Sequence, residues 1–112
     1  MPHTTERLDL LPRHRERIVQ ILAEHLPDVE VWAYGSRVNG RSHPGSDLDL
    51  ALREPNLRPL DPAALRRARE AFQDSTIPFF VQAHDWARLP TYFHREIESR
   101  YTVLRRSLPG GN

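Results

Sequence analysis

The 112 residues predict one small α/β domain that is not doubly wound. Three observations support this prediction. The length suits a single compact domain. Helical and strand-like patterns follow one another in the order α-β-β-α-β-α. The segment between the first two strands is too short for the crossover helix that a parallel pair would need.

The first half of the chain predicts one helix and two strands. Over residues 12–26 the apolar side chains recur at helical spacing, and Pro27 ends the run. Residues 29–34 alternate, with β-branched and aromatic side chains, which is typical of a strand. A stretch rich in Gly, Ser, Asn and Pro follows over residues 35–46, and we expect a second short strand over residues 47–52.

The second half predicts two further helices around a third strand. Asp61 followed by Pro62 is a typical helix start, with an N-cap and a proline in the first helical turn. Residues 77–84 predict the third strand, and residues 90–99 predict the last helix. The apolar segment over residues 101–104 fits either a helix or a strand.

These elements define the predicted domain organisation. We expect a flexible tail over residues 1–9, one domain over residues 10–106 and a second flexible tail over residues 107–112. No apolar run approaches the length of a membrane span, and no apolar signal segment opens the chain. A soluble, cytoplasmic protein is therefore expected.

Composition excludes several classes of site. The chain has no cysteine, which excludes disulfides and zinc held by thiolates. The formal net charge is only +1, so direct, nonspecific binding to nucleic acid is not expected. The chain has no lysine. Contacts to phosphate must therefore come from arginine, from hydroxyl groups or from backbone N–H groups.

A pair of aspartates is the first half of the chemical motif. Asp47 and Asp49 are separated by one residue, so on a strand their side chains point to the same face. Two neighbouring carboxylates repel each other unless a cation lies between them. Mg²⁺ is a suitable partner because it prefers oxygen ligands and bridges carboxylates to substrate phosphates.

The second half of the motif is Gly35-Ser36, which directly follows a predicted strand. A sharp turn at this point opens a short helix, and it directs backbone N–H groups and the serine hydroxyl towards one place. Such a turn holds phosphates. A phosphate-binding turn beside a metal-binding carboxylate pair suits the transfer of a nucleotidyl group.

The stretch VWAYGSRVNGRSHPGSDLDLAL resembles the signature of the minimal nucleotidyltransferases of the DNA-polymerase-β superfamily, and IPFFVQAHDW resembles their third-strand segment. The resemblance covers about residues 8–106. It implies the α+β class, with a mixed and largely antiparallel sheet backed by helices. It also implies Mg²⁺-dependent transfer of a nucleoside monophosphate from a nucleoside triphosphate.

The resemblance assigns roles to single residues. Gly35 and Ser36 would bind the β- and γ-phosphates, and Asp47 and Asp49 would bind the metal and carry catalysis. Arg37 matches a basic residue that usually follows the serine. Two interpretations of Arg37 remain open, a nucleotide contact through phosphate and a structural ion pair.

The third strand departs from the pattern of these nucleotidyltransferases. Where they typically have a third catalytic carboxylate, this chain has Gln82. An amide supplies an oxygen ligand but neither the negative charge nor the ability to accept a proton. His84 lies on the same face of the predicted strand and is a second candidate for a base. Two interpretations follow, an active enzyme with an altered second metal site, and a weakened subunit that binds NTP and metal and sequesters its partner.

The chain offers no separate module for an acceptor. Small relatives of this type commonly act with a helical HEPN-type partner in toxin–antitoxin or two-component arrangements. The resemblance therefore implies an antitoxin-like nucleotidyltransferase, of the adenylyltransferase type and using ATP, that modifies or sequesters such a partner. Homodimerisation is compatible with the sequence as well.

Overall fold

The computed structural model describes residues 4–106. The elements follow in the order α1 (Pro12–His25), β1 (Glu30–Tyr34), α2 (Ser36–Asn39), β2 (Leu48–Arg53), α3 (Pro62–Gln73), β3 (Val81–Asp85), a 3-10 turn η1 (Trp86–Arg88), α4 (Thr91–Ser99) and β4 (Thr102–Arg105).

The four strands form one mixed sheet in the order β3-β2-β1-β4. β1 is antiparallel to both of its neighbours, and β3 is parallel to β2. The predicted fold class is confirmed, because the sheet is mixed, mostly antiparallel and backed by helices. The connection from β1 to β2 contains only α2 and a loop, as the short segment required.

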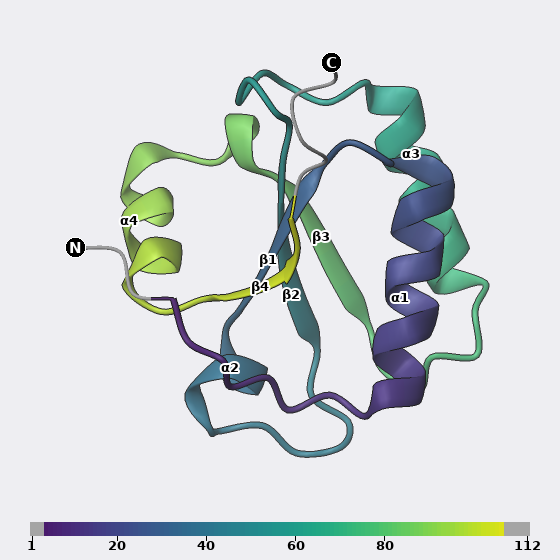
Figure 1. Cartoon of the computed structure of the whole chain (residues 1–112), viewed down its shortest axis with the longest axis vertical. Helices are drawn as coiled ribbons and strands as arrows, with labels where there is room; N and C mark the ends of the chain where they lie inside the picture. The colour runs from purple at the N-terminus through teal and green to yellow at the C-terminus, as the bar shows by residue number, and fades with distance from the viewer. Residues whose placement is uncertain (1–3, 107–112) are drawn as a thin grey trace.

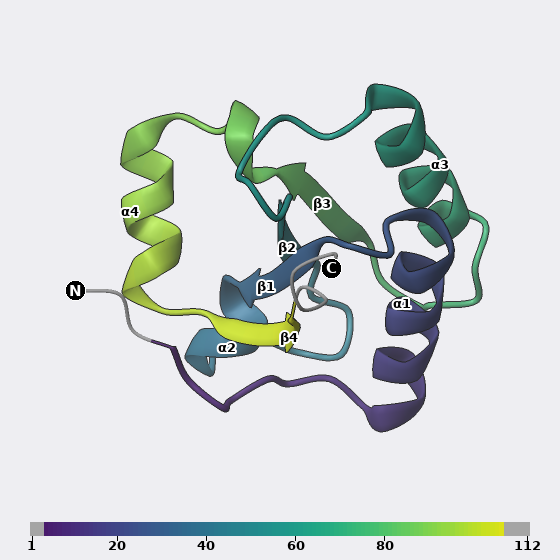
Figure 2. The same ribbon diagram turned by 45° about the horizontal axis from the view of Figure 1, so that its top comes forward.

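The molecule has three layers (Figure 1). α1 and α3 cover one face of the sheet, and α4 lies on the opposite face, an arrangement that the turned view also shows (Figure 2). α2 lies at one end of the sheet, between β1 and the loop that leads to β2. This end of the sheet carries the motif described above.

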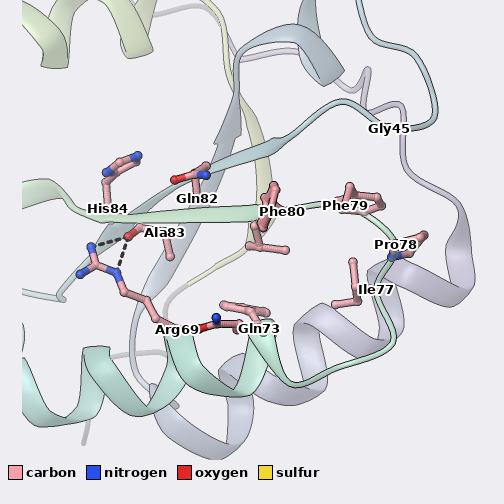
Figure 3. Close-up of a pocket in the computed structure, with 12 residues that line it drawn as sticks. Gly45, Arg69, Gln73, Ile77, Pro78, Phe79, Phe80, Gln82, Ala83 and His84 are labelled. Atoms are coloured by element: carbon pink, nitrogen blue, oxygen red, sulfur yellow. Dashed lines mark hydrogen bonds between the residues drawn. The ribbon is translucent and has the colours of Figure 1, made fainter.

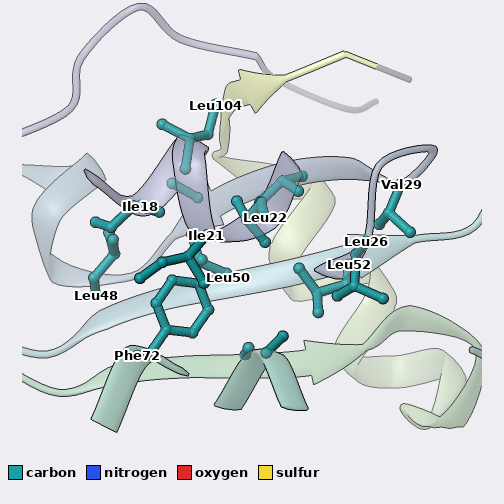
Figure 4. Packing of buried hydrophobic residues seen from close by; sticks show 14 of the residues in the cluster. Ile18, Ile21, Leu22, Leu26, Val29, Leu48, Leu50, Leu52, Phe72 and Leu104 are labelled. Carbon is teal, nitrogen blue, oxygen red and sulfur yellow. The ribbon is translucent and has the colours of Figure 1, made fainter. Parts of the chain in front are cut away.

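The main core lies between the sheet and the pair α1 and α3. Alternate residues of β2, namely Leu48, Leu50 and Leu52, are fully buried against Ile21 of α1 and its neighbours (Figure 4). Phe72 of α3 completes this layer. The remaining members of the buried cluster are Ile18, Leu22, Leu26, Val29, Val31, Ala33, Val38, Leu60, Leu65, Ala68, Ala83 and Leu104. Because side chains alternate along a strand, the residues between the β2 leucines face the α4 side.

A smaller aromatic cluster joins α4 to the sheet. Trp32 of β1 stacks on Tyr101 with ring centroids 3.8 Å apart, and it meets Trp86 edge-on. Ile97 of α4 is buried in the same cluster. The guanidinium of Arg53 lies 4.0 Å above the Trp32 ring. Such contacts each contribute about 0.5–1.5 kcal/mol beyond simple burial, so this cluster holds α4 in place.

One segment differs from the sequence prediction, and another resolves a choice that the sequence left open. The third strand begins at Val81, so the prediction of strand over residues 77–80 is wrong. Pro78 has no N–H and fixes its own φ, which disfavours a regular strand there. Residues 101–104, which the pattern left undecided, contribute most of β4.

The N-terminal segment makes specific contacts over residues 4–9. The Thr5 N–H donates to the Tyr101 carbonyl at 2.7 Å, and the Asp9 N–H donates to the Arg37 carbonyl at 2.7 Å. Residues 1–3 and 107–112, for which flexible tails are predicted, lie outside the described residues. None of the helices in the described part is long and apolar enough to cross a membrane.

Candidate active site

The end of β1 and the start of β2 bring the two halves of the motif together. Tyr34 is the Cα partner of Asp49 in the antiparallel register, so Gly35 lies beside the aspartate pair. Asp47 precedes β2 and is exposed, whereas Asp49 is partly buried. Leu48 faces the main core, so both carboxylates belong to the opposite, α4 side of the sheet.

Gly35 has a backbone conformation and a close contact that a residue with a side chain would not tolerate. Its φ of 83° and ψ of −154° are accessible essentially only to glycine. A Cβ at this position would overlap Oδ2 of Asp49. The backbone of Gly35 and the carboxylate of Asp49 are thus in direct contact. The spacing in the sequence did not reveal this contact, although it predicted that both halves act together.

The environment of Asp49 favours a bound cation. Burial raises the pKa of Asp49, and the nearby Asp47 carboxylate raises it further. Both effects disfavour the charged form, and a divalent ion between the two carboxylates would reverse them. Within residues 4–106 no cluster of three or more His, Cys, Asp or Glu side chains is present. Any metal here would therefore rely on two carboxylates together with substrate, water or amide oxygens.

α2 begins at Ser36, next to the carboxylates. The N–H groups of Val38 and Asn39 donate to the Gly35 carbonyl at 3.0 and 3.1 Å and close the first turn. The N–H groups that precede them in a helix have no intrahelical partner and point towards its N-terminus. Gly40, in a left-handed conformation, ends this short helix after four residues.

Arg37 is buried and is held by backbone carbonyls. Its side chain donates to Ser46 O at 2.8 and 3.0 Å, to Pro44 O at 2.9 Å and to Asp9 O at 2.7 Å. Its guanidinium also lies 4.0 Å above the Phe79 ring. These contacts tie α2 to the loop that leads directly into Asp47. These hydrogen bonds favour a structural role for Arg37 over a direct contact to phosphate. The partners are backbone carbonyls, whereas the structural interpretation of the sequence had an ion pair.

Gln82 lies next to Asp49 on the neighbouring strand. The two residues are Cα partners in the parallel register, and Gln82 is exposed. His84 is two positions farther along and pairs with Ala51 instead. Burial lowers the pKa of His84, and the nearby Arg69 lowers it further, which keeps the imidazole neutral. Of the two, Gln82 is the residue beside the carboxylate pair.

Tyr34 belongs to this site and was not identified from the sequence. Burial raises the pKa of its phenol, and Asp49 raises it further, so the side chain stays protonated. Its position immediately before Gly35 was the available signal. Asp85, by contrast, is buried and accepts hydrogen bonds from the N–H groups of Leu60 and Ala87, a structural role.

Two hollows are lined by neighbours of the carboxylate pair, one by Gln82 and the other by Gly35. The larger, of about 620 Å³, runs along the outer edge of β3 between that strand and α3 (Figure 3). We call it the β3 groove; it is lined by Gly45, Arg69, Phe72, Gln73, Ile77, Pro78, Phe79, Phe80, Val81, Gln82, Ala83 and His84. The smaller, of about 330 Å³, lies between α2 and α4 and includes Tyr34 and Gly35.

Known proteins resemble this chain in sequence and in fold. Residues 15–100 match a family described as the nucleotidyltransferase domain. A protein of Haemophilus influenzae named "Probable protein adenylyltransferase MntA" is 38% identical over 99 residues, which cover 88% of this chain and 85% of that protein.

Solved structures share the fold. A toxin-antitoxin crystallised with AMP-PNP superposes with a TM-score of 0.68 at 20% identity, covering 83% of this chain and 73% of the other. A mutant of the toxin-antitoxin MntA-HpeT gives a TM-score of 0.67 at 18% identity, with the same coverage. At these identities the likeness shows a common fold.

Proposed function

The chain belongs to the nucleotidyltransferase domain family and is a transferase, and we propose that it moves the adenylyl group of ATP, with Mg²⁺, to a hydroxyl on a helical HEPN-type partner. The observation that carries this proposal is the contact between the Gly35 backbone and the Asp49 carboxylate. It joins a phosphate-binding turn to a metal-binding pair at one point.

The choice of ATP rests on proteins similar to this chain. The relative from Haemophilus influenzae is named an adenylyltransferase, and one structure with the same fold was solved with AMP-PNP. The partner is proposed on similar grounds, because both solved structures are described as toxin-antitoxin proteins. The HEPN type of that partner follows from the sequence resemblance alone.

Asp47 and Asp49 would hold the metal. Their repulsion, and the raised pKa of Asp49, fit a site that a hard divalent cation completes. When bound, Mg²⁺ would neutralise charge on the phosphates as the bond to the leaving pyrophosphate breaks. Backbone N–H groups at Gly35-Ser36, with the Ser36 hydroxyl, orient and stabilise that pyrophosphate.

The amide at Gln82 favours a second candidate function. Its position beside Asp49 is where a carboxylate would accept the proton of the attacking hydroxyl, and an amide does not accept one. A chain that binds ATP and metal but transfers slowly would act as a regulatory subunit that sequesters its partner. The two functions share the nucleotide site and differ in turnover.

Calorimetric titration with ATP and Mg²⁺, followed by an assay for transfer of label from α-labelled ATP to a helical HEPN-type protein, tests both. Label on the partner that disappears in the Asp47→Asn/Asp49→Asn variant supports the enzyme. Tight binding of ATP without transfer selects the sequestering subunit. Absence of ATP binding contradicts both proposals.

A further inference from the structure

The β3 groove lies along the outer edge of β3, on the α3 side of the sheet, and it reaches the side of the carboxylate pair at Gln82, the Cα partner of Asp49. β3 is the edge strand of the sheet, and β2, which carries Asp49, separates it from β1, which leads into Gly35. In Figure 3, Gln82 and His84 rise from β3 on one side, while Arg69 and Gln73 of α3 lie on the other.

The geometry of phosphoryl chemistry gives this groove a role. In nucleotidyl transfer the attacking oxygen and the leaving oxygen lie roughly in line, on opposite sides of the α-phosphorus. If the pyrophosphate leaves at Gly35-Ser36, beside β1, the attacking hydroxyl arrives from the side of β3. We propose that the β3 groove binds the acceptor, a polypeptide segment whose hydroxyl residue has an apolar neighbour and an acidic neighbour.

This inference rests on the proposed function, and its reaction balances. The acceptor oxygen forms a bond to the α-phosphorus of ATP, and the bond from that phosphorus to the bridging oxygen of pyrophosphate breaks. Pyrophosphate leaves with the electron pair of that bond. The hydroxyl proton passes to water at the open side of the groove, because the Gln82 amide beside Asp49 does not accept a proton and His84 lies farther along the strand, opposite Ala51.

Apolar side chains in the groove favour a polypeptide. Ile77, Phe79 and Phe80 line its outer part, and Phe80 is 73% exposed. An exposed phenylalanine next to a candidate active site is an apolar contact that a partner can bury. An RNA acceptor would instead require a groove with several basic side chains.

The charge of the groove indicates which polypeptide fits. Among the residues of the described part that line it, Arg69 is the one with a permanent charge, and none is a carboxylate. The Nε and Nη2 atoms of Arg69 donate to the Ala83 carbonyl at 3.0 and 2.6 Å, which fixes the guanidinium along the strand edge. Its Nη1 has no hydrogen bond to any residue in the described part of the chain, which leaves those donors for an acidic side chain.

Two variants with similarly exposed aromatic residues test this inference. Phe80→Ser removes the apolar contact in the groove, and Tyr92→Ser is the matched control, since Tyr92 of α4 is 68% exposed and lies outside the groove. The probes are short peptides with one tyrosine, serine or threonine between an apolar and an acidic residue, and the same peptides with arginine in place of the acidic residue. Transfer of label from α-labelled ATP and the affinity for ATP with Mg²⁺ are measured.

We expect Phe80→Ser to lower kcat/KM for the acidic peptide by about tenfold, mainly through KM. Tyr92→Ser should leave it within about twofold, and both variants should bind ATP as the wild type does. The arginine peptides should be poorer acceptors. Equal loss in the two variants, loss in Tyr92→Ser alone, transfer only to RNA, or ATP binding without transfer to any peptide would each overturn the inference. Absence of ATP binding would instead overturn the proposed function on which it rests.

Discussion

At the scale of single residues, Gly35 leaves the space that the Asp49 carboxylate occupies. Gly35→Ala introduces a Cβ where Oδ2 of Asp49 lies, in a backbone conformation that alanine disfavours. We expect the affinity for ATP with Mg²⁺ to fall by at least about tenfold, with a loss of about 1–3 kcal/mol in the free energy of unfolding. Calorimetry and urea denaturation measure the two effects.

Gly45→Ala is the control for that substitution. A Cβ at Gly45 would meet only the His43 ring at 3.5 Å, an ordinary contact. We expect Gly45→Ala to change the affinity for ATP and the free energy of unfolding only slightly. An unchanged ATP affinity in Gly35→Ala would show that the contact with Asp49 is unimportant for the site.

A second prediction at this scale concerns Gln82, the Cα partner of Asp49. Gln82→Asp introduces a group that accepts a proton and carries charge beside the Asp47/Asp49 pair. In a weakened enzyme this should raise kcat by about ten- to a hundredfold in the transfer assay. Gln20→Asp, at an exposed position of α1, adds the same charge far from the site and should leave kcat unchanged. No gain from Gln82→Asp would favour the sequestering subunit.

At the scale of elements, Arg37 connects α2 to the loop before β2. Arg37→Lys replaces a planar group that reaches three carbonyls with a single ammonium, and it removes the stacking on Phe79. We expect it to lower the free energy of unfolding by about 2–4 kcal/mol, measured by urea denaturation. The exposed Arg41 in the same loop gives the control, Arg41→Lys, with an effect below about 0.5 kcal/mol.

The same pair of variants separates the two interpretations of Arg37. A structural role predicts a loss of stability, and any weaker binding of ATP would follow from displacement of the loop. A direct contact to phosphate predicts weaker binding of ATP with little change in stability. The second outcome would contradict the role that the hydrogen bonds indicate.

At the scale of the whole molecule, the partly buried Asp49 carboxylate lowers the free energy of unfolding at neutral pH. Because the folded-state pKa of Asp49 is raised, the native protein binds its proton more readily than the unfolded chain does. This carboxyl therefore lowers stability above its raised pKa, and the penalty disappears as the pH falls towards its ordinary value, near pH 4. Asp49→Asn should raise Tm by a few degrees at pH 7 in EDTA, and the difference should shrink near pH 4.

Mg²⁺ extends this prediction. It should raise the Tm of the wild type and have little effect on Asp49→Asn, because a ligand stabilises only the state that binds it. Asp74→Asn, at an exposed position after α3, serves as the control and should behave as the wild type does. Equal Tm values for wild type and Asp49→Asn at pH 7 would contradict the proposed repulsion.

The amino-acid sequence alone predicted the fold class and several local features, and it proposed the residues of the candidate site. Helical spacing in α1, the start of α3 at Asp61 and the alternation in β1 are local signals, and the structure has each of them. The shared face of Asp47 and Asp49 is likewise a local signal, because side chains alternate between the two faces of a strand. The local pattern was misleading at residues 77–80. Their apolar composition predicted a strand, but Pro78 disfavours one and β3 begins at Val81.

The tertiary structure decided what depends on contacts between distant segments. The overlap of a Gly35 Cβ with Asp49, the pairing of Gln82 with Asp49 and the groove along β3 all depend on the register between neighbouring strands. The hydrogen bonds of Arg37 reach residues that lie up to 28 positions away. Side-chain pattern fixes which face of a strand a residue occupies, whereas packing across strands fixes which residue becomes its neighbour.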